Sequence, residues 1–200
     1  GVECVRGLFR SHPASSKTDG IEFGFTYSRD TAWGKFGVKS DTPYTRRSLF
    51  TDSNGNTTEF VGAYTGNPNW KWRSVATLDW TKGDWDASWT TRYTSAQDEA
   101  GGCNVTLQNS APIICNHPNE TSKNALIALN GLVFNRIGAT TFHDVQVGWR
   151  APWKAHLSVG ARNVFGKEPP LVNNTFAQSF DASYDLPGGP FYYFQYRQDF

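Results

Sequence analysis

The sequence predicts an all-β protein, an antiparallel β-barrel whose strands cross a membrane. Aromatic residues make up 15% of the 200 residues, and 19 glycines accompany them, a composition that favours strands and turns. Apolar and polar residues alternate along several segments, which is the pattern of a strand with one apolar face. Short turns and long polar loops separate these segments in alternation, so one rim of the sheet carries all of the insertions.

Seven segments alternate clearly enough to be predicted as strands. They form three hairpins with short turns and one closing strand: residues 21–28 with 36–38, 70–80 with 85–93, 143–150 with 155–162, and 192–200. Residues 44–69, 95–140 and 166–190 are rich in polar and turn-forming residues and are predicted as loops. Weaker patterns suggest an eighth strand at residues 5–10 and a short helix at residues 125–134.

The unequal loop lengths favour an outer membrane over a soluble environment. Outer-membrane barrels combine short periplasmic turns, long external loops and strands of about 9–11 residues. Every backbone amide in lipid must pair within the sheet, so one face of each strand meets hydrocarbon and the other can line an aqueous interior. The charged residues expected on the interior face are Arg73, Asp79, Arg92, Asp144, Arg150, Arg162 and Arg197. The aromatic residues expected on the lipid face, near strand ends, are Trp70, Trp80, Trp85, Trp149 and Tyr192.

Several other classes of protein are excluded or unsupported. A net charge of +1 provides no concentrated basic face for nucleic acid. No segment has the roughly 20 apolar residues of a transmembrane helix, and the N-terminus lacks the pattern of a signal peptide. The four histidines have no metal-ligand spacing, and no nucleophile lies in a recognisable context with a base. We therefore expect neither an enzyme nor a bound cofactor or metal.

Motifs near the C-terminus resemble those of a known family. Residues 143–149 (HDVQVGW), followed by residues 161–170 (ARNVFGKEPP), resemble the final hairpin of TonB-dependent outer-membrane receptors. Residues 184–200 look like the closing strand of the same family, and shorter pieces at residues 19–23 and 78–85 are also similar to it. The resemblance thus covers most of the chain.

The resemblance implies a Gram-negative outer-membrane receptor that takes up a siderophore, cobalamin or an oligosaccharide with energy delivered through TonB. It also implies a 22-stranded barrel with a plug domain. Residues 1–200 are then expected to be the C-terminal seven or eight strands, with the plug, the TonB box and the earlier strands outside this sequence. The implied partners are outer-membrane lipid, the TonB complex and the barrel-assembly machinery. That machinery would read aromatic residues at alternating positions near the chain end: Tyr192, Phe194, Tyr196 and Phe200.

Two further sets of residues are candidates for specific roles. Cys103 and Cys115 lie twelve residues apart in the second long loop, and an oxidising location predicts a disulfide between them, whereas Cys4 has no visible partner. Loop residues that could contact a ligand are Tyr44, Tyr64, Asn67, Trp70, Asp98, Asn104 and His117. The alternative for these residues is a purely structural role in covering the loops and the rim.

Two other architectures stay open from the sequence. A complete eight-stranded outer-membrane barrel with a structural or adhesive role predicts hydrogen bonds between the first and the last strand. A soluble carbohydrate-binding β-sandwich predicts tryptophans buried between two stacked sheets.

Overall fold

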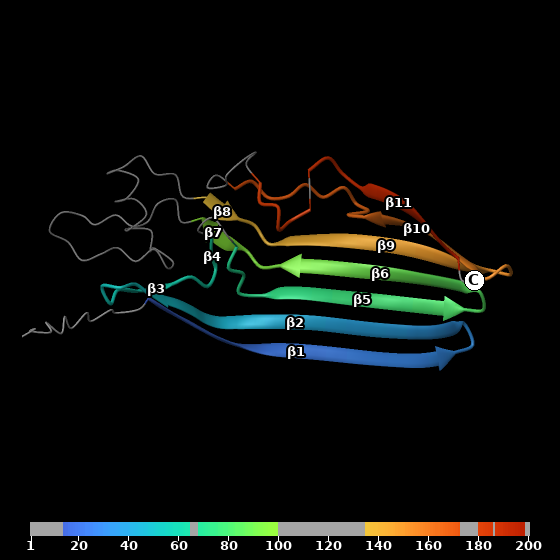
Figure 1. The fold of residues 1–200 in the computed structure, drawn as a ribbon, viewed down its shortest axis with the longest axis horizontal. Helices are drawn as coiled ribbons and strands as arrows, with labels where there is room; N and C mark the ends of the chain where they lie inside the picture. Colours follow the sequence, from blue (N-terminus) through green and yellow to red (C-terminus); the bar gives the residue numbers. More distant parts are fainter. Residues whose placement is uncertain (1–13, 65–67, 100–134, 173–179, 186, 199–200) are drawn as a thin grey trace, which may run out of the picture.

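The computed structural model describes residues 14–64, 68–99, 135–172, 180–185 and 187–198. Its main feature is one antiparallel sheet with the strand order β1-β2-β5-β6-β9-β10-β11 (Figure 1). The bounds of these strands are β1 (Ser15–Thr31), β2 (Gly34–Thr51), β5 (Arg73–Lys82), β6 (Trp85–Thr94), β9 (Thr140–Ala151), β10 (Ala155–Arg162) and β11 (Phe191–Gln198). The predicted all-β, antiparallel architecture is confirmed.

Three short turns join the strands at one end of the sheet, on the right in Figure 1. Gly83 lies in the turn between β5 and β6 with φ 59°, and Lys154 lies in the turn between β9 and β10 with φ 61°. Tight hairpin turns require such positive φ angles, which glycine adopts without strain. All of the longer connections leave from the opposite end, as the sequence predicts.

The register of the strands gives the sheet one continuous apolar face. A single row of paired residues crosses all seven long strands: Tyr27, Val38, Leu78, Trp89, Val145, Ala161 and Tyr192. Large side chains on this face lie open, since Phe25 is 57% exposed and Val159 is 55% exposed. An exposed apolar surface of this extent is what a lipid environment covers. The tryptophans of the strands are therefore not buried between stacked sheets, which contradicts the soluble sandwich.

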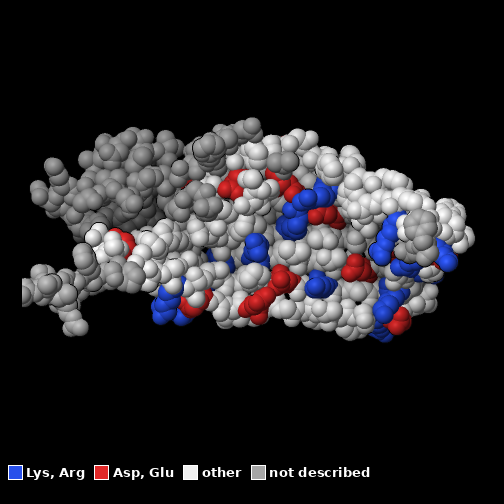
Figure 2. Space-filling model, in the orientation of Figure 1, with Lys and Arg blue, Asp and Glu red and all other residues white. Residues whose placement is uncertain are grey.

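The opposite face, here called the polar face, has the complementary composition. The adjacent row of paired residues reads Ser28, Gly37, Asp79, Ser88, Gln146, Gly160 and Tyr193. Figure 2 shows Lys, Arg, Asp and Glu side chains over the middle of the strands as well as near their ends. The predicted placement of the strand Arg and Asp residues on this face is confirmed by the register.

Two glycines on the polar face make room for side chains from the neighbouring strands. A Cβ atom at Gly160 would collide with the ring of Tyr193, which lies across Gly160 and donates a hydrogen bond to Gln146 Oε1 at 2.9 Å. A Cβ atom at Gly148 would collide with Asp86 and His156, which lie 2.9 Å apart. A glycine in a strand interior weakens the strand, and the side chains that pack closely over these two glycines offset that loss of stability.

The predicted loops contain more structure than the sequence indicates. Residues 44–51 were predicted to begin a loop, but they continue β2, because β1 extends back to Ser15 and pairs with β2 as far as Thr51. Short strands follow within the long connections: β3 (Thr57–Glu59), β4 (Ala63–Tyr64), β7 (Gln97–Glu99) and β8 (Asn135–Ile137). The strand predicted at residues 5–10 and the helix predicted at residues 125–134 lie outside the described residues.

β1 and β11 lie at opposite edges of the sheet rather than next to each other, so the pairing expected for a complete eight-stranded barrel is not found among the described strands. No helix in the described part of the chain is long and apolar enough to cross a membrane.

Candidate functional site

The polar face and the ends of the long connections meet at one end of the sheet, and the candidate site lies there. β4, β7 and β8 form a small second sheet in which β4 pairs with β7 in parallel and β7 pairs with β8 antiparallel. Each of these strands has two or three residues, too few to be stable alone. Their side chains must therefore pack against other segments.

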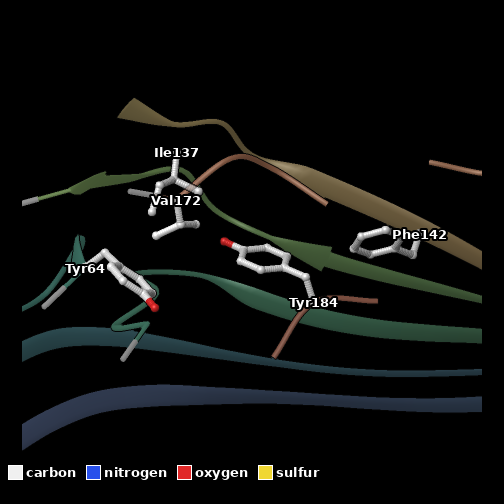
Figure 3. Close-up of a cluster of buried hydrophobic side chains, with 5 residues drawn as sticks. All are labelled: Tyr64, Ile137, Phe142, Val172 and Tyr184. Atoms are coloured by element: carbon white, nitrogen blue, oxygen red, sulfur yellow. The ribbon is translucent and has the colours of Figure 1, made fainter. Parts of the chain in front are cut away.

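That packing forms a buried cluster at the loop end, shown in Figure 3: Tyr64, Ile137, Phe142, Val172 and Tyr184. These residues come from β4, β8, β9 and the connection between β10 and β11, so four separate parts of the chain meet. Burying an apolar side chain stabilises the folded chain by about 1.5–3 kcal/mol relative to leaving it exposed. The cluster thus holds the connections in defined positions above the polar face.

Polar contacts fix the same connections. The Tyr64 hydroxyl donates to Asp181 Oδ2 at 2.5 Å, and the Trp70 indole N–H donates to the Tyr184 hydroxyl at 3.1 Å. Burial raises the pKa of Tyr64, and the hydrogen bond to Asp181 raises it further. Burial acts to raise the pKa of Asp181, but hydrogen bonds from Ser183 and Tyr64 outweigh it and lower this pKa below its ordinary value.

An ion-pair network joins the β10–β11 connection to the strands. Arg92 on β6 donates two hydrogen bonds to Asp144 on β9, at 2.8 and 2.9 Å, and two to Asp185 in the connection, at 3.1 and 2.5 Å. Arg162 at the end of β10 donates to Asp185 at 3.3 Å. Charge-assisted bidentate contacts of this kind are about twice as strong as neutral hydrogen bonds. Asp185 therefore fastens the connection to the polar face.

The start of the same connection is a tight turn built by the NVFGK residues. Asn163 has φ 52°, and its side chain both donates to the carbonyl oxygen of Lys167 at 2.8 Å and accepts from the N–H of Lys167 at 2.9 Å. Its own N–H donates to Asp144 at 2.8 Å, and Gly166 provides a second positive φ of 63°. Asparagine and glycine are the residues that such left-handed positions favour.

The described residues line two cavities at this end of the sheet. The larger, of about 630 Å³, lies under the β10–β11 connection, and Arg162, Tyr184, Asp185 and Phe191 contribute to its wall. The second, of about 380 Å³, is here called the Trp70 pocket. Its wall includes Thr18, Thr45, Ser48, Val61, Trp70 and Arg73. Both volumes lie in the range of about 300–1,000 Å³ that is usual for small-molecule sites.

The structure brings together two of the predicted ligand-contacting residues. Tyr64 and Trp70 both pack with Tyr184, and Trp70 also lines the second cavity. The expectation that Trp70 faces lipid is wrong, because β5 begins three residues later and the Trp70 ring packs edge-on against Tyr184. Asp98 lies in β7 of the small sheet.

Other predicted site residues lie elsewhere. Tyr44 belongs to β2 rather than to a loop, and its ring lies 4.4 Å from that of Trp72 on the apolar face, away from both cavities. Tyr192, Phe194 and Tyr196 alternate along β11 and share the apolar face. Six predicted site residues lie outside the described residues: Asn67, Cys103, Asn104, Cys115, His117 and Phe200.

Sequence reasoning missed the residues that assemble this end of the molecule. Arg92 and Asp144 were expected on the polar face, and their pairing follows once the register of β6 and β9 is known. Asp185 is 93 residues from Arg92, and Tyr184 is 114 residues from Trp70, so no local pattern connects them. The described residues contain no group of three or more His, Cys, Asp or Glu that could hold a metal.

Comparison with known proteins identifies a β-barrel family, in agreement with the antiparallel sheet described above. The model of the TonB-dependent receptor-like β-barrel family matches residues 6–164, about four fifths of the chain. The chain belongs to this family. No curated protein and no solved structure matches it. The receptors of this family are transporters rather than enzymes, and they lie in the outer membrane of Gram-negative bacteria.

Family membership shows what surrounds each face of the antiparallel sheet. The apolar face meets outer-membrane lipid, and the polar face meets the interior of the barrel. The short turns lie on the periplasmic side and the long connections on the external side. The Trp70 pocket and the larger cavity consequently lie at the external end of the receptor.

Proposed function

We propose that this receptor binds an external substrate of the siderophore, cobalamin or oligosaccharide class at the loop end of its polar face and moves it inward with energy from the TonB complex. Family membership supports energised transport, and the two cavities at the loop end support the place of binding. In this proposal Tyr64 and Asp98 position the connections around the site, and Trp70 contributes directly to a cavity wall.

The observation that carries the proposal is the unequal construction of the two ends of the sheet. At one end the strands are joined by short turns, whereas at the other end four connected segments build a buried cluster and two cavities over the polar face. A purely structural barrel wall does not require such a construction.

We further propose that the chain forms the C-terminal third of a 22-stranded barrel with a plug domain. β1 has 17 residues and forms one edge of the sheet, and β11 forms the other. Each unpaired backbone amide costs several kcal/mol in hydrocarbon, so both edges require partner strands. In the same proposal the barrel-assembly machinery reads Tyr192, Phe194, Tyr196 and Phe200, and Cys103 pairs with Cys115 in an external loop.

Uptake in cells tests the transport proposal. A strain that expresses the complete receptor, a strain without it and a strain without TonB are each given a ferric siderophore, cyanocobalamin or an oligosaccharide as the sole source of the nutrient concerned. The proposal predicts that growth on one of the three requires both the receptor and TonB. Growth on all three that is independent of the receptor would contradict it.

A further inference from the structure

The Trp70 pocket contains polar groups that the fold does not use. Among the described residues, the hydroxyls of Thr18, Thr45 and Ser48 and the guanidinium of Arg73 have no hydrogen-bond or ion-pair partner. The Arg73 head group lies over the ring of Trp70, 5.8 Å from its centroid. Elsewhere on the polar face, Arg92, by contrast, is fully engaged by carboxylates.

The charge in the pocket has one sign. Arg73 is the one charged residue of the described wall. The carboxylate of Glu59 adjoins the pocket through Ser48, but it already accepts hydrogen bonds from the N–H groups of Ser48, Phe60 and Val61, at 2.7, 3.1 and 3.1 Å. A guanidinium without a carboxylate partner beside a cavity attracts an anionic group, and its planar shape suits a carboxylate or a phosphate in particular.

The rest of the wall suits a ring that carries hydroxyl groups. Val61 and Trp70 give the cavity an apolar side, against which the C–H groups of a sugar ring can pack. The three threonine and serine hydroxyls can each donate and accept, as hydroxyl groups of a ligand require. A volume of about 380 Å³ is enough for a small ligand or for one part of a larger one.

We propose that the Trp70 pocket binds an acidic saccharide, with a carboxylate of the sugar paired to Arg73 and its hydroxyls bonded to Thr45 and its neighbours. This inference rests on the proposed uptake function and names the substrate class. It predicts that the receptor discriminates a sugar acid from the neutral sugar of the same shape, because only the acid supplies a carboxylate for a charge-assisted contact with Arg73.

Calorimetric titration of the complete receptor in detergent micelles tests the pocket independently of transport. The probes are a trimer of galacturonic acid, the galactose trimer of the same linkage, and citrate, which carries carboxylates without a sugar ring. The galacturonic acid trimer is expected to bind at least tenfold more tightly than either of the others. Equal affinity for the acidic and neutral trimers, equal affinity for citrate, or no binding of the acidic trimer would overturn the proposal.

Matched variants locate the site. Arg73→Gln is expected to weaken binding of the acidic trimer about tenfold or more, because a charge-assisted contact is lost. Thr45→Val tests the hydroxyls without changing any charge and is expected to weaken binding severalfold. Lys39→Gln removes the same charge from the polar face outside the pocket wall and is expected to change the affinity less than twofold. An equal loss in Lys39→Gln, or none in Arg73→Gln, would overturn the proposal.

The two proposals can fail separately. TonB-dependent uptake of a substrate, with no change in the affinity for the acidic trimer in Arg73→Gln, would contradict the pocket assignment alone. Binding of the acidic trimer that depends on Arg73, without any TonB-dependent uptake, would support the pocket and contradict the transport proposal.

Discussion

Removing the carboxylate of Asp185 should release the β10–β11 connection from the polar face. Asp185 accepts two hydrogen bonds from Arg92 and one from Arg162, and its side chain is only 11% exposed. Breaking a buried ion pair costs about 3–5 kcal/mol, but Arg92 keeps its bidentate contact with Asp144. We therefore expect Asp185→Asn to destabilise the closed position of the connection by about 2–3 kcal/mol, the value of one strong charge-assisted contact.

Hydrogen exchange measured by mass spectrometry reports this change directly. Local opening that becomes about 2–3 kcal/mol easier should speed exchange in residues 180–185 by roughly 30- to 150-fold, while exchange within β5 and β6 stays unchanged. Asp41→Asn is the control, since Asp41 lies on the polar face without an ion-pair partner among the described residues. Unchanged hydrogen-exchange protection of residues 180–185 in Asp185→Asn, or an equal loss of that protection in Asp41→Asn, would refute the claim that Asp185 holds the connection against the polar face.

Leu78→Arg should lower the free energy of unfolding from lipid vesicles by about 2–4 kcal/mol, measured by urea titration, because it places a charge in hydrocarbon. Ser88→Arg on the polar face should change this free energy by less than about 1 kcal/mol. Equal losses in the two variants would contradict the assignment of the faces. Gly160→Ala should lower the free energy of unfolding by about 1–3 kcal/mol in the same assay, because the added methyl group collides with the Tyr193 ring. Gly24→Ala is the control and should leave this free energy unchanged, because the space around Gly24 is open. Because the pKa of Asp181 is lowered in the folded protein, its carboxylate contributes to the stability of the β10–β11 connection above its unfolded pKa of about 3.9. That contribution is lost as the pH falls through the folded pKa. Proteolysis of the connection should therefore accelerate below about pH 4 in the wild type, and this pH dependence should be absent in Asp181→Asn.

The strands could be predicted because their pattern is local. Phe23 and Phe25 alternate with polar neighbours, and that spacing alone places both on one face of β1. The turn at Gly83 is equally local, because its positive φ suits glycine. The charged residues of the polar face followed from the same alternation, so the environment of the sheet was accessible from the sequence.

The site could not be predicted in the same way, because its contacts join distant segments. Tyr64 meets Asp181 across 117 residues, and Trp70 meets Tyr184 across 114. The alternation around Trp70 continues that of β5 and predicts its ring on the lipid face, but β5 begins only at Arg73 and the Trp70 ring packs edge-on against Tyr184. Residue 44 was assigned to a loop for a related reason, since the length of β2 depends on its pairing with β1.

The claim that the apolar face meets lipid is tested most directly by spin labels along β6, whose pairing partners are known on both sides. Single cysteines replace Ala87, Ser88, Trp89 and Thr90 in turn in the complete receptor, after its native cysteines are removed, and the labelled protein is placed in lipid bilayers. We predict that oxygen, which dissolves in lipid, relaxes the labels at 87 and 89, and that a water-soluble nickel complex relaxes those at 88 and 90. Access of the nickel complex to all four positions would contradict the account.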